Sequence, residues 1–456
     1  MNLRDILNAI CATKKIFDHM KYFIEEKYYF NIPVNHVRTS NMYNMKNVRL
    51  RNAEEYNKDK DLYIHENVDL SDNRTITNII IDADIFNNIV KLPINANKLT
   101  IYNMIDNKKI VFFTQHMKEM YVSYKNKVSK NTYDVREKID NLTIRGRCQI
   151  EIKQLPSHMN YLEIEAYSIN DDVISFSQIK IKTMKIYCSK RINITEYPLS
   201  LVHLVLGHNF NDLVDNLPKS LKCLQIDSKF NQPIDNLPNG IDHIILGGSF
   251  NNNLDKLPTN LKKLQLGCSF DKKLDNLPRF LEYLEIYGSF DQTIDKLPPS
   301  LKALKISFRF NKSIDYLPKN LEFLYLYGCF NNNISNLSPN LKYLFIQGNF
   351  DQDVDYLPAG LSLLSISGRF YRMIKNIPSS LLYLSLPDII DIHVPPKTDS
   401  LRVLHRNIEK IDVYNVFCEK EETKRLDLEL LFDNKVYIKK IYPCKVCNDL
   451  NNYSSR

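Results

Sequence analysis

Phenylalanine recurs at intervals of twenty residues through the second half of the chain. The nine positions are Phe210, Phe230, Phe250, Phe270, Phe290, Phe310, Phe330, Phe350 and Phe370. Each begins a version of F-[ND]-x-x-[ILV]-D-x-L-P-x-x-L-x-x-L-x-[IL], and no insertion interrupts the series. Self-similarity at such a period marks a repeat architecture, in which each unit packs against its neighbours. The chain should therefore fold as stacked coils, although its 456 residues would otherwise suggest two to four compact domains.

Weaker copies extend the series toward the N-terminus, because an apolar triplet stays in phase at spacings of 20 to 22 residues. The triplets are Leu201/Leu204/Leu206, Ile181/Met184/Ile186, Met159/Leu162/Ile164, Ile139/Leu142/Ile144, Met117/Met120/Val122, Ala96/Leu99/Ile101 and Ile76/Ile79/Ile81. Together with the regular copies they predict about sixteen coils, and Leu401/Leu404 marks a candidate seventeenth.

Each element of the repeat has a mechanical interpretation. In L-x-x-L-x-I the last two apolar residues alternate with exposed ones, which predicts a short strand with one buried face. Pro cannot donate a ladder hydrogen bond and belongs at a corner, and the Asp before it, such as Asp235, could accept from the backbone two residues on. Twenty residues leave no room for a long helix. We therefore expect a leucine-rich-repeat-like solenoid with one parallel β-sheet and a helical N-terminal cap.

Equivalent positions of successive coils form columns of neighbours about 4.8 Å apart. The residue after the first Leu alternates in sign from Lys222 and Asp242 to Lys342, which predicts a ladder of ion pairs that fixes the register. The Asn or Asp after each Phe predicts a ladder of turn-capping side chains, and the Phe column itself predicts the core.

Two columns that point outward from the strands are rich in aromatic residues. The predicted partner-binding residues are Tyr283, Tyr287, Phe323, Tyr325, Tyr327, Tyr343 and Phe345. A contiguous exposed patch of this kind is rare on a soluble monomer without a function. The alternatives are that these rings stack on one another for stability, or that they reflect a composition rich in Tyr and Phe.

The repeat resembles that of the FNIP repeat proteins, a leucine-rich-repeat-like group named for a Phe-Asn-Ile-Pro stretch and found mainly in slime moulds and giant viruses of amoebae. The resemblance is strong over residues 190–387 and weaker over 76–189. Two departures are visible, since Ser338-Pro339 shifts the Pro by one place, and Ser335 and Lys375 replace the corner Asp.

The N-terminal residues 1–36 have apolar residues at helical spacing, which predicts a cap on the first coil. The stretch DILNAICATKKIFDHMKYFI also resembles the later part of an F-box, without the Leu-Pro-x-Glu opening of that motif. This resemblance implies docking on the Skp adaptor of a cullin ubiquitin ligase.

The expected organisation has four parts. They are a helical or irregular cap, possibly F-box-like, over 1–75, degenerate repeats over 76–189, regular repeats over 190–387, and a repeat remnant with a capping segment over 388–456. In the last part Cys444 and Cys447 form a C-x-x-C pair, but a zinc site would need two further ligands. We therefore interpret them as free thiols and expect no metal and no cofactor.

No catalytic motif is recognisable, and no catalytic residue is predicted. The first twenty residues contain charges and no uninterrupted apolar stretch, so we expect no signal peptide, and no segment reaches membrane-spanning length. Nine scattered Cys suit a reducing, intracellular and cytoplasmic setting. The net charge of +8 is modest, and nucleic-acid binding through the basic segment 98–147 is the least favoured hypothesis. The sequence predicts a non-enzymatic protein-interaction scaffold, with an F-box-type substrate adaptor as the alternative.

Overall fold

The computed structural model describes two compact units built from parallel strands. The described residues are 30–33, 47–51, 78–82, 97–104, 117–124, 130–134, 138–146, 149–169, 173–207, 209–372, 374–386 and 402–404. Unit 1 comprises residues 1–210 and 216–221, and unit 2 comprises residues 211–215 and 222–456.

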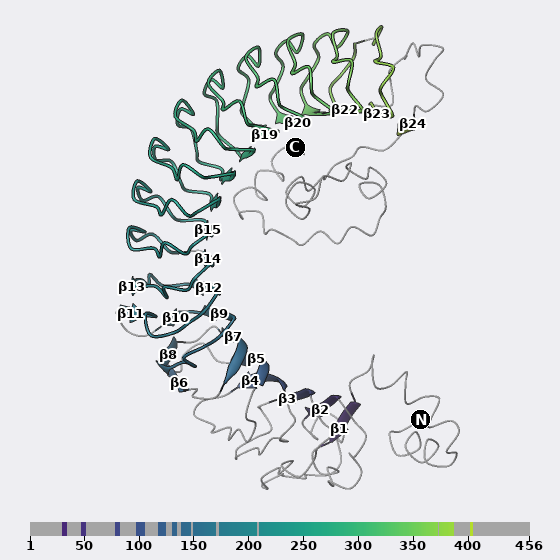
Figure 1. The fold of residues 1–456 in the computed structure, drawn as a ribbon. Helices are drawn as coiled ribbons and strands as arrows, with labels where there is room; N and C mark the ends of the chain where they lie inside the picture. The colour runs from purple at the N-terminus through teal and green to yellow at the C-terminus, as the bar shows by residue number, and fades with distance from the viewer. Residues whose placement is uncertain are drawn as a thin grey trace, which may run out of the picture. The chain divides into compact units, whose positions relative to one another are not determined.

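Unit 1 contains a ladder of parallel strands in chain order (Figure 1). These strands are β1 (Phe30–Pro33), β2 (Asn47–Arg51), β3 (Asn78–Asp82), β4 (Lys98–Met104), β5 (Met117–Tyr124), β7 (Ile139–Gly146), β9 (Tyr161–Ala166), β12 (Thr183–Cys188) and β14 (His203–Leu206). In β12 the side chains alternate between buried and half-buried, as the period-two pattern predicts.

The expectation of a single sheet is wrong for unit 1. A three-stranded parallel sheet contains β6 (Lys130–Asp134), β8 (Gln149–Gln154) and β10 (Ser168–Ile169), and a two-stranded one contains β11 (Val173–Ser175) and β13 (Asn193–Glu196). These segments occupy the returning limbs of degenerate coils, which lack the D-x-L-P pattern of the regular repeats.

Unit 2 contains the regular coils and a second ladder of parallel strands. They are β15 (Cys223–Ile226), β16 (His243–Leu246), β17 (Lys263–Leu266), β18 (Tyr283–Ile286), β19 (Ala303–Phe308), β20 (Phe323–Gly328), β21 (Tyr343–Gly348), β22 (Leu363–Gly368), β23 (Tyr383–Ser385) and β24 (Arg402–Leu404). Paired residues on neighbouring strands are twenty positions apart in the sequence, as Leu284 and Leu304 are. The last pair of strands differs, since Leu384 on β23 pairs with Val403 on β24. The parallel-strand solenoid predicted from the repeat is therefore confirmed.

The number of coils differs slightly from the sixteen expected, since the two ladders together contain nineteen strands among the described residues. Strands β3, β4, β5 and β7 keep the predicted phase upstream, and β1 and β2 lie ahead of the first predicted coil. The sequence of β1 is itself FNIP. Residues 1–29 lie outside the described residues, so the helical cap and the four-part division stay predictions.

The core of unit 2 is a continuous stack of phenylalanine rings. From Phe230 to Phe370 successive ring centroids lie 6.0–6.2 Å apart, with interplanar angles of 3–15°. Leu284 and Ile286 on β18 and their equivalents are fully buried beside this stack. Burial confirms the predicted Phe core.

Side-chain ladders join the coils at both turns. The Asn or Asp after each Phe accepts a hydrogen bond from the backbone N–H of the equivalent residue in the next coil, as Asn231 Oδ1 does from Asn251 at 2.9 Å, which confirms a turn-capping ladder. The corner Asp residues behave differently from the predicted Asx-turn. Asp255 Oδ1 accepts from Asn276 of the next coil at 2.9 Å, and Asp275 pairs with Lys296 at 3.5 Å.

The corner Pro begins a tight turn. At or just after the end of several strands of unit 2, one residue has a positive φ. The Leu281 N–H donates to the Pro278 carbonyl at 3.0 Å. Gly288 and Gly328 have φ values of 76° and 105°, and an added Cβ would lie 2.3–2.4 Å from a carbonyl oxygen of the preceding coil. Phe308 occupies the same column with φ of 67°, and its ring packs edge-on against Tyr327 at 5.2 Å.

We predict that Phe290→Ala lowers the free energy of unfolding by roughly 3–5 kcal/mol, because it empties a fully buried aromatic site between two stacked rings. Phe280→Ala is the matched control. Its ring is 46% exposed, so the loss should stay below about 1 kcal/mol. Urea denaturation followed by circular dichroism measures both, and equal midpoints for the two variants would contradict the Phe core.

Candidate protein interface on the outward strand face

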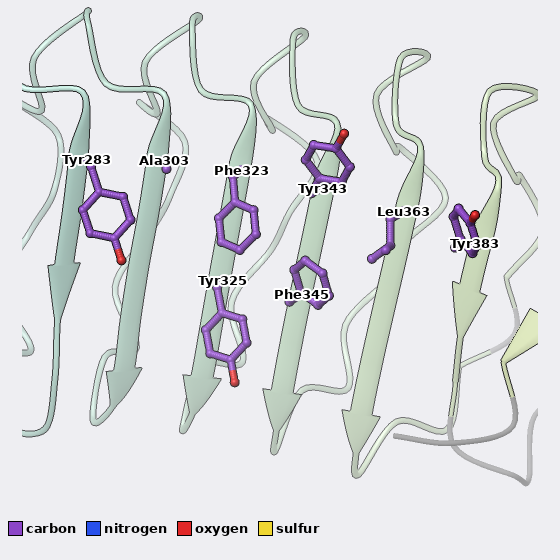
Figure 2. Close-up of a cluster of buried hydrophobic side chains, with 8 residues drawn as sticks. All are labelled: Tyr283, Ala303, Phe323, Tyr325, Tyr343, Phe345, Leu363 and Tyr383. Atoms are coloured by element: carbon purple, nitrogen blue, oxygen red, sulfur yellow. The ribbon is translucent and has the colours of Figure 1, made fainter. Parts of the chain in front are cut away.

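The outward strand face is the side of each ladder that points away from the Leu and Phe core. In unit 2 it carries the aromatic residues predicted to bind a partner. Figure 2 shows that Phe323 and Tyr325 project from one strand and Tyr343 and Phe345 from the next, with their side chains on one face. Tyr283 lies two strands away from Phe323, across Ala303. The sequence therefore placed these residues on the correct face.

Their predicted exposure is wrong. The aromatic cluster consists of Tyr283, Ala303, Phe323, Tyr325, Tyr343, Phe345, Leu363 and Tyr383, and every member is buried. Tyr283 is 2% exposed and Phe345 is 1% exposed, while Tyr327 is partly buried against the cluster and Tyr287 is half-buried. The side chains pack on one another across the strands, with the Phe345 ring centroid 5.4 Å from Phe323 and 6.0 Å from Tyr325.

A buried charge network borders the aromatic cluster on the same face. The Glu285 carboxylate accepts hydrogen bonds at Oε2 from Gln265 at 2.7 Å and from the Tyr283 hydroxyl at 2.5 Å. Lys305 Nζ lies 2.6 Å from Glu285 Oε1 and about 5 Å from the ring centroids of Tyr287 and Tyr325, at 5.2 and 5.3 Å. One cation therefore joins the carboxylate to two aromatic rings.

The network determines the charge state of its members. Burial alone would raise the pKa of Glu285, but the charge of Lys305 and the hydrogen bonds that the carboxylate accepts lower it overall. Burial raises the pKa of the Tyr325 hydroxyl, and burial together with the charge of Glu285 raises that of Tyr283 well above its ordinary value. The carboxylate is thus ionised and both hydroxyls are neutral at pH 7. The hydrogen bonds and the ion pair hold these side chains in a structural network.

In unit 1 the outward strand face is more open. One row of this face contains Lys98, Glu119, Asn141 and Tyr161, which are neighbours on β4, β5, β7 and β9. Glu119 is exposed, and the other three are half-buried. The next row contains Thr100, Tyr121, Thr143, Glu163 and Lys185. Sequence reasoning missed this face, although the outward columns could have been extended upstream into the degenerate coils.

An ion pair at the centre of this face positions two tyrosines. Arg145 donates through Nε and Nη2 to Glu163 Oε1 at 3.1 and 2.6 Å, and the Tyr161 hydroxyl donates to Glu163 Oε2. The Arg145 guanidinium also lies 5.9 Å from the Tyr121 ring centroid. Burial alone would raise the pKa of Glu163, but the hydrogen bonds from Tyr161 and Arg145 lower it overall.

A shallow hollow of about 580 Å³ lies on this face. It is lined by Lys98, Leu99, Thr100, Glu119, Met120, Tyr121, Asn141, Thr143 and Tyr161. Sites for small groups typically have volumes of about 300–1,000 Å³. The lining mixes aromatic rings with hydroxyl, amide and paired charged groups, which suits recognition of a polar surface.

Within the described ranges no three His, Cys, Asp or Glu side chains are grouped so that they could hold a metal ion. In the same part of the chain no helix has the length and apolar character needed to cross a membrane. Cys444 and Cys447, and the F-box-like stretch over residues 5–24, lie outside the described residues, so the predictions about them stay untested.

We predict that Lys305→Met lowers the free energy of unfolding by roughly 3–5 kcal/mol at pH 7, because it leaves the buried Glu285 carboxylate without a cation. Lys302→Met is the control, since its partner Glu282 is an exposed group at 3.0 Å and the loss should be at most about 1 kcal/mol. Urea denaturation of both variants measures the difference. Equal losses would show that the Glu285 pair is as weak as a surface pair.

We further predict that the stability contributed by the Glu285 carboxylate depends on pH. The pKa of Glu285 is lower in the folded chain than its ordinary value, so this contribution is fully present above about pH 4.3 and is lost as the pH falls through the folded-state value. The difference in unfolding free energy between the parent and Glu285→Gln should therefore shrink as pH falls from 5 to 3. Urea titrations across this range test it, and a constant difference would contradict the assigned direction.

Comparison with known proteins finds a matching family of repeats and solved structures of low similarity. The FNIP Repeat family profile matches residues 213–249 and 230–269, and no curated protein matches the sequence. A crystal structure of CroV588, described as a novel circular LRR protein, is 20% identical, with a TM-score of 0.47 over 78% of this chain and 68% of that chain. YopM from Yersinia enterocolitica WA-314 is 16% identical, with a TM-score of 0.42 over 79% of this chain and 87% of that chain. Residues 213–269 therefore carry FNIP repeats, and they lie within a longer solenoid of parallel strands.

Proposed function

We propose that the protein is a non-enzymatic interaction scaffold that binds a protein partner through the outward strand face of unit 1. The observation that carries this proposal is the open surface over β4, β5, β7 and β9, where tyrosines, threonines, an asparagine and paired charges surround a hollow. Tyrosine offers a large contact area at low conformational-entropy cost, and small polar residues add adaptable hydrogen bonds.

The two units offer different surfaces to a partner. On unit 2 the aromatic side chains between β18 and β23 are buried in a cluster, which supports a role in stability over direct contact with a partner. A binding role for Tyr283, Tyr287, Phe323, Tyr325, Tyr327, Tyr343 and Phe345 stays a prediction. On unit 1 no other described segment covers the outward side chains of β4, β5, β7 and β9, so a partner could contact them directly.

The second hypothesis, a substrate adaptor for a Skp-cullin ubiquitin ligase, concerns residues 1–36. Only 30–33 of these are described, and they form strand β1. No contact among the described residues favours the adaptor function, so the interaction scaffold is our conclusion.

Photo-crosslinking in a cell lysate tests the proposal. A benzophenone amino acid replaces Thr143 on the outward face of β7, and the matched control carries it at Lys256, whose side chain is 69% exposed on a corner of unit 2. We expect discrete protein crosslinks from position 143 and none in common from position 256, as measured by mass spectrometry. Crosslinks to nucleic acid alone, or the same proteins from both positions, would overturn the proposal.

A further inference from the structure

We propose that the hollow over β4, β5, β7 and β9 is a docking site for a proline-rich segment of the partner in the polyproline II conformation. This proposal rests on the proposed function, because it names the part of the partner that the scaffold recognises.

The walls of the hollow are two tyrosine rings on alternate strands. Tyr121 lies on β5 and Tyr161 on β9, and β7 lies between them with the smaller Asn141 and Thr143. Two strand spacings and a two-residue offset place the roots of the two rings roughly 12 Å apart. The rings themselves take up part of this separation, so the remaining width suits one extended peptide chain better than an α-helix, whose diameter with side chains is about 10–12 Å.

Both walls are held in place before a ligand arrives. The Glu163 carboxylate accepts from Arg145 and from the Tyr161 hydroxyl, and Arg145 reaches back to the Tyr121 ring. Lys185 Nζ lies 5.4 Å from the Tyr161 ring centroid. Such preorganised aromatic walls reduce the entropy lost when a peptide binds.

The lining is electrically balanced. The two charged residues that line the hollow, Lys98 and Glu119, pair with each other at 2.6 Å, and beside it Arg145 pairs with Glu163 at 2.6 Å. A charged peptide would find no unpaired charge of opposite sign among the residues that line the hollow. A neutral segment is therefore the better match.

The remaining polar groups fit a chain that offers carbonyl oxygens. Among the described residues no hydrogen bond engages the side chains of Thr100, Asn141 or Thr143, which line the hollow. A polyproline II segment has no internal hydrogen bonds and leaves its carbonyl groups free, while its prolines have no N–H to satisfy. Aromatic-lined grooves are the sites that bind such segments, because the conformation is already formed in the free peptide.

Fluorescence anisotropy with fluorescein-labelled decaproline and the full chain tests the proposal. The control peptide has ten alternating Gly and Ser residues, which form a flexible coil. We expect saturable binding of decaproline and none of the control. Thr143→Tyr, which fills the hollow, and Tyr121→Ala, which removes one wall, should each weaken binding at least tenfold, while Tyr316→Ala on an exposed corner of unit 2 should leave it unchanged.

Circular dichroism of each variant confirms the fold, and Thr143→Tyr keeps the test valid if Tyr121→Ala fails to fold. The absence of saturable decaproline binding by the parent, or binding that neither hollow variant weakens, would overturn the docking site. If decaproline fails to bind while position 143 still crosslinks to a protein, the docking site is refuted and the scaffold function stands. If both experiments fail, both proposals fall.

Discussion

The structure depends on the repeated contact between equivalent residues of successive coils. Parallel strands stack at about 4.8 Å, so every side chain has its own counterpart from the next coil as its nearest neighbour. A residue type can therefore recur along a column when it packs well against a copy of itself. Phenylalanine meets this condition by stacking at 6.0–6.2 Å from Phe230 to Phe370, and asparagine meets it by capping the next turn. This stacking of equivalent positions explains why similar residues recur every twenty residues in the sequence.

Charged columns cannot meet the same condition, because like charges would be neighbours. The chain solves the problem in two ways. After the first Leu the sign alternates, and Lys302 pairs with Glu282 and Lys342 with Glu322 at 3.0 and 2.7 Å. At the corner most coils keep an Asp, and the residue one place after the equivalent Asp of the next coil binds its carboxylate. Asn276 donates a hydrogen bond to Asp255, and Lys296 forms an ion pair with Asp275. The predicted Asx-turn failed because a neighbouring coil supplies a better partner than the local backbone.

Most of the fold and the direction of each outward side chain could be predicted from the sequence, because period and alternation are one-dimensional properties. The Phe core, the parallel strands and the Asn ladder followed from them. Solvent exposure did not, because it depends on what packs on a side chain as well as on where the side chain points. Tyr325 points outward as predicted, yet it is buried beside Phe345. The additional sheets of β6, β8, β10, β11 and β13 were missed because the prediction relied on the pattern of the regular coils, which have no second strand there.

The spacing of aromatic residues along a column explains why one outward face is filled and the other is hollowed. In unit 2 aromatic residues occupy the consecutive strands β20 and β21, so Phe323, Tyr325 and Phe345 pack directly on one another. In unit 1 Tyr121 and Tyr161 lie on alternate strands, and the residues between them are small and polar. The two rings therefore do not pack on each other, and the polar residues between them line the hollow. Rings on adjacent strands contribute to stability, whereas the polar strand between Tyr121 and Tyr161 supports the proposed docking site. Polarity matters as well as spacing, because Tyr283 and Phe323 are also two strands apart but have the buried Ala303 between them.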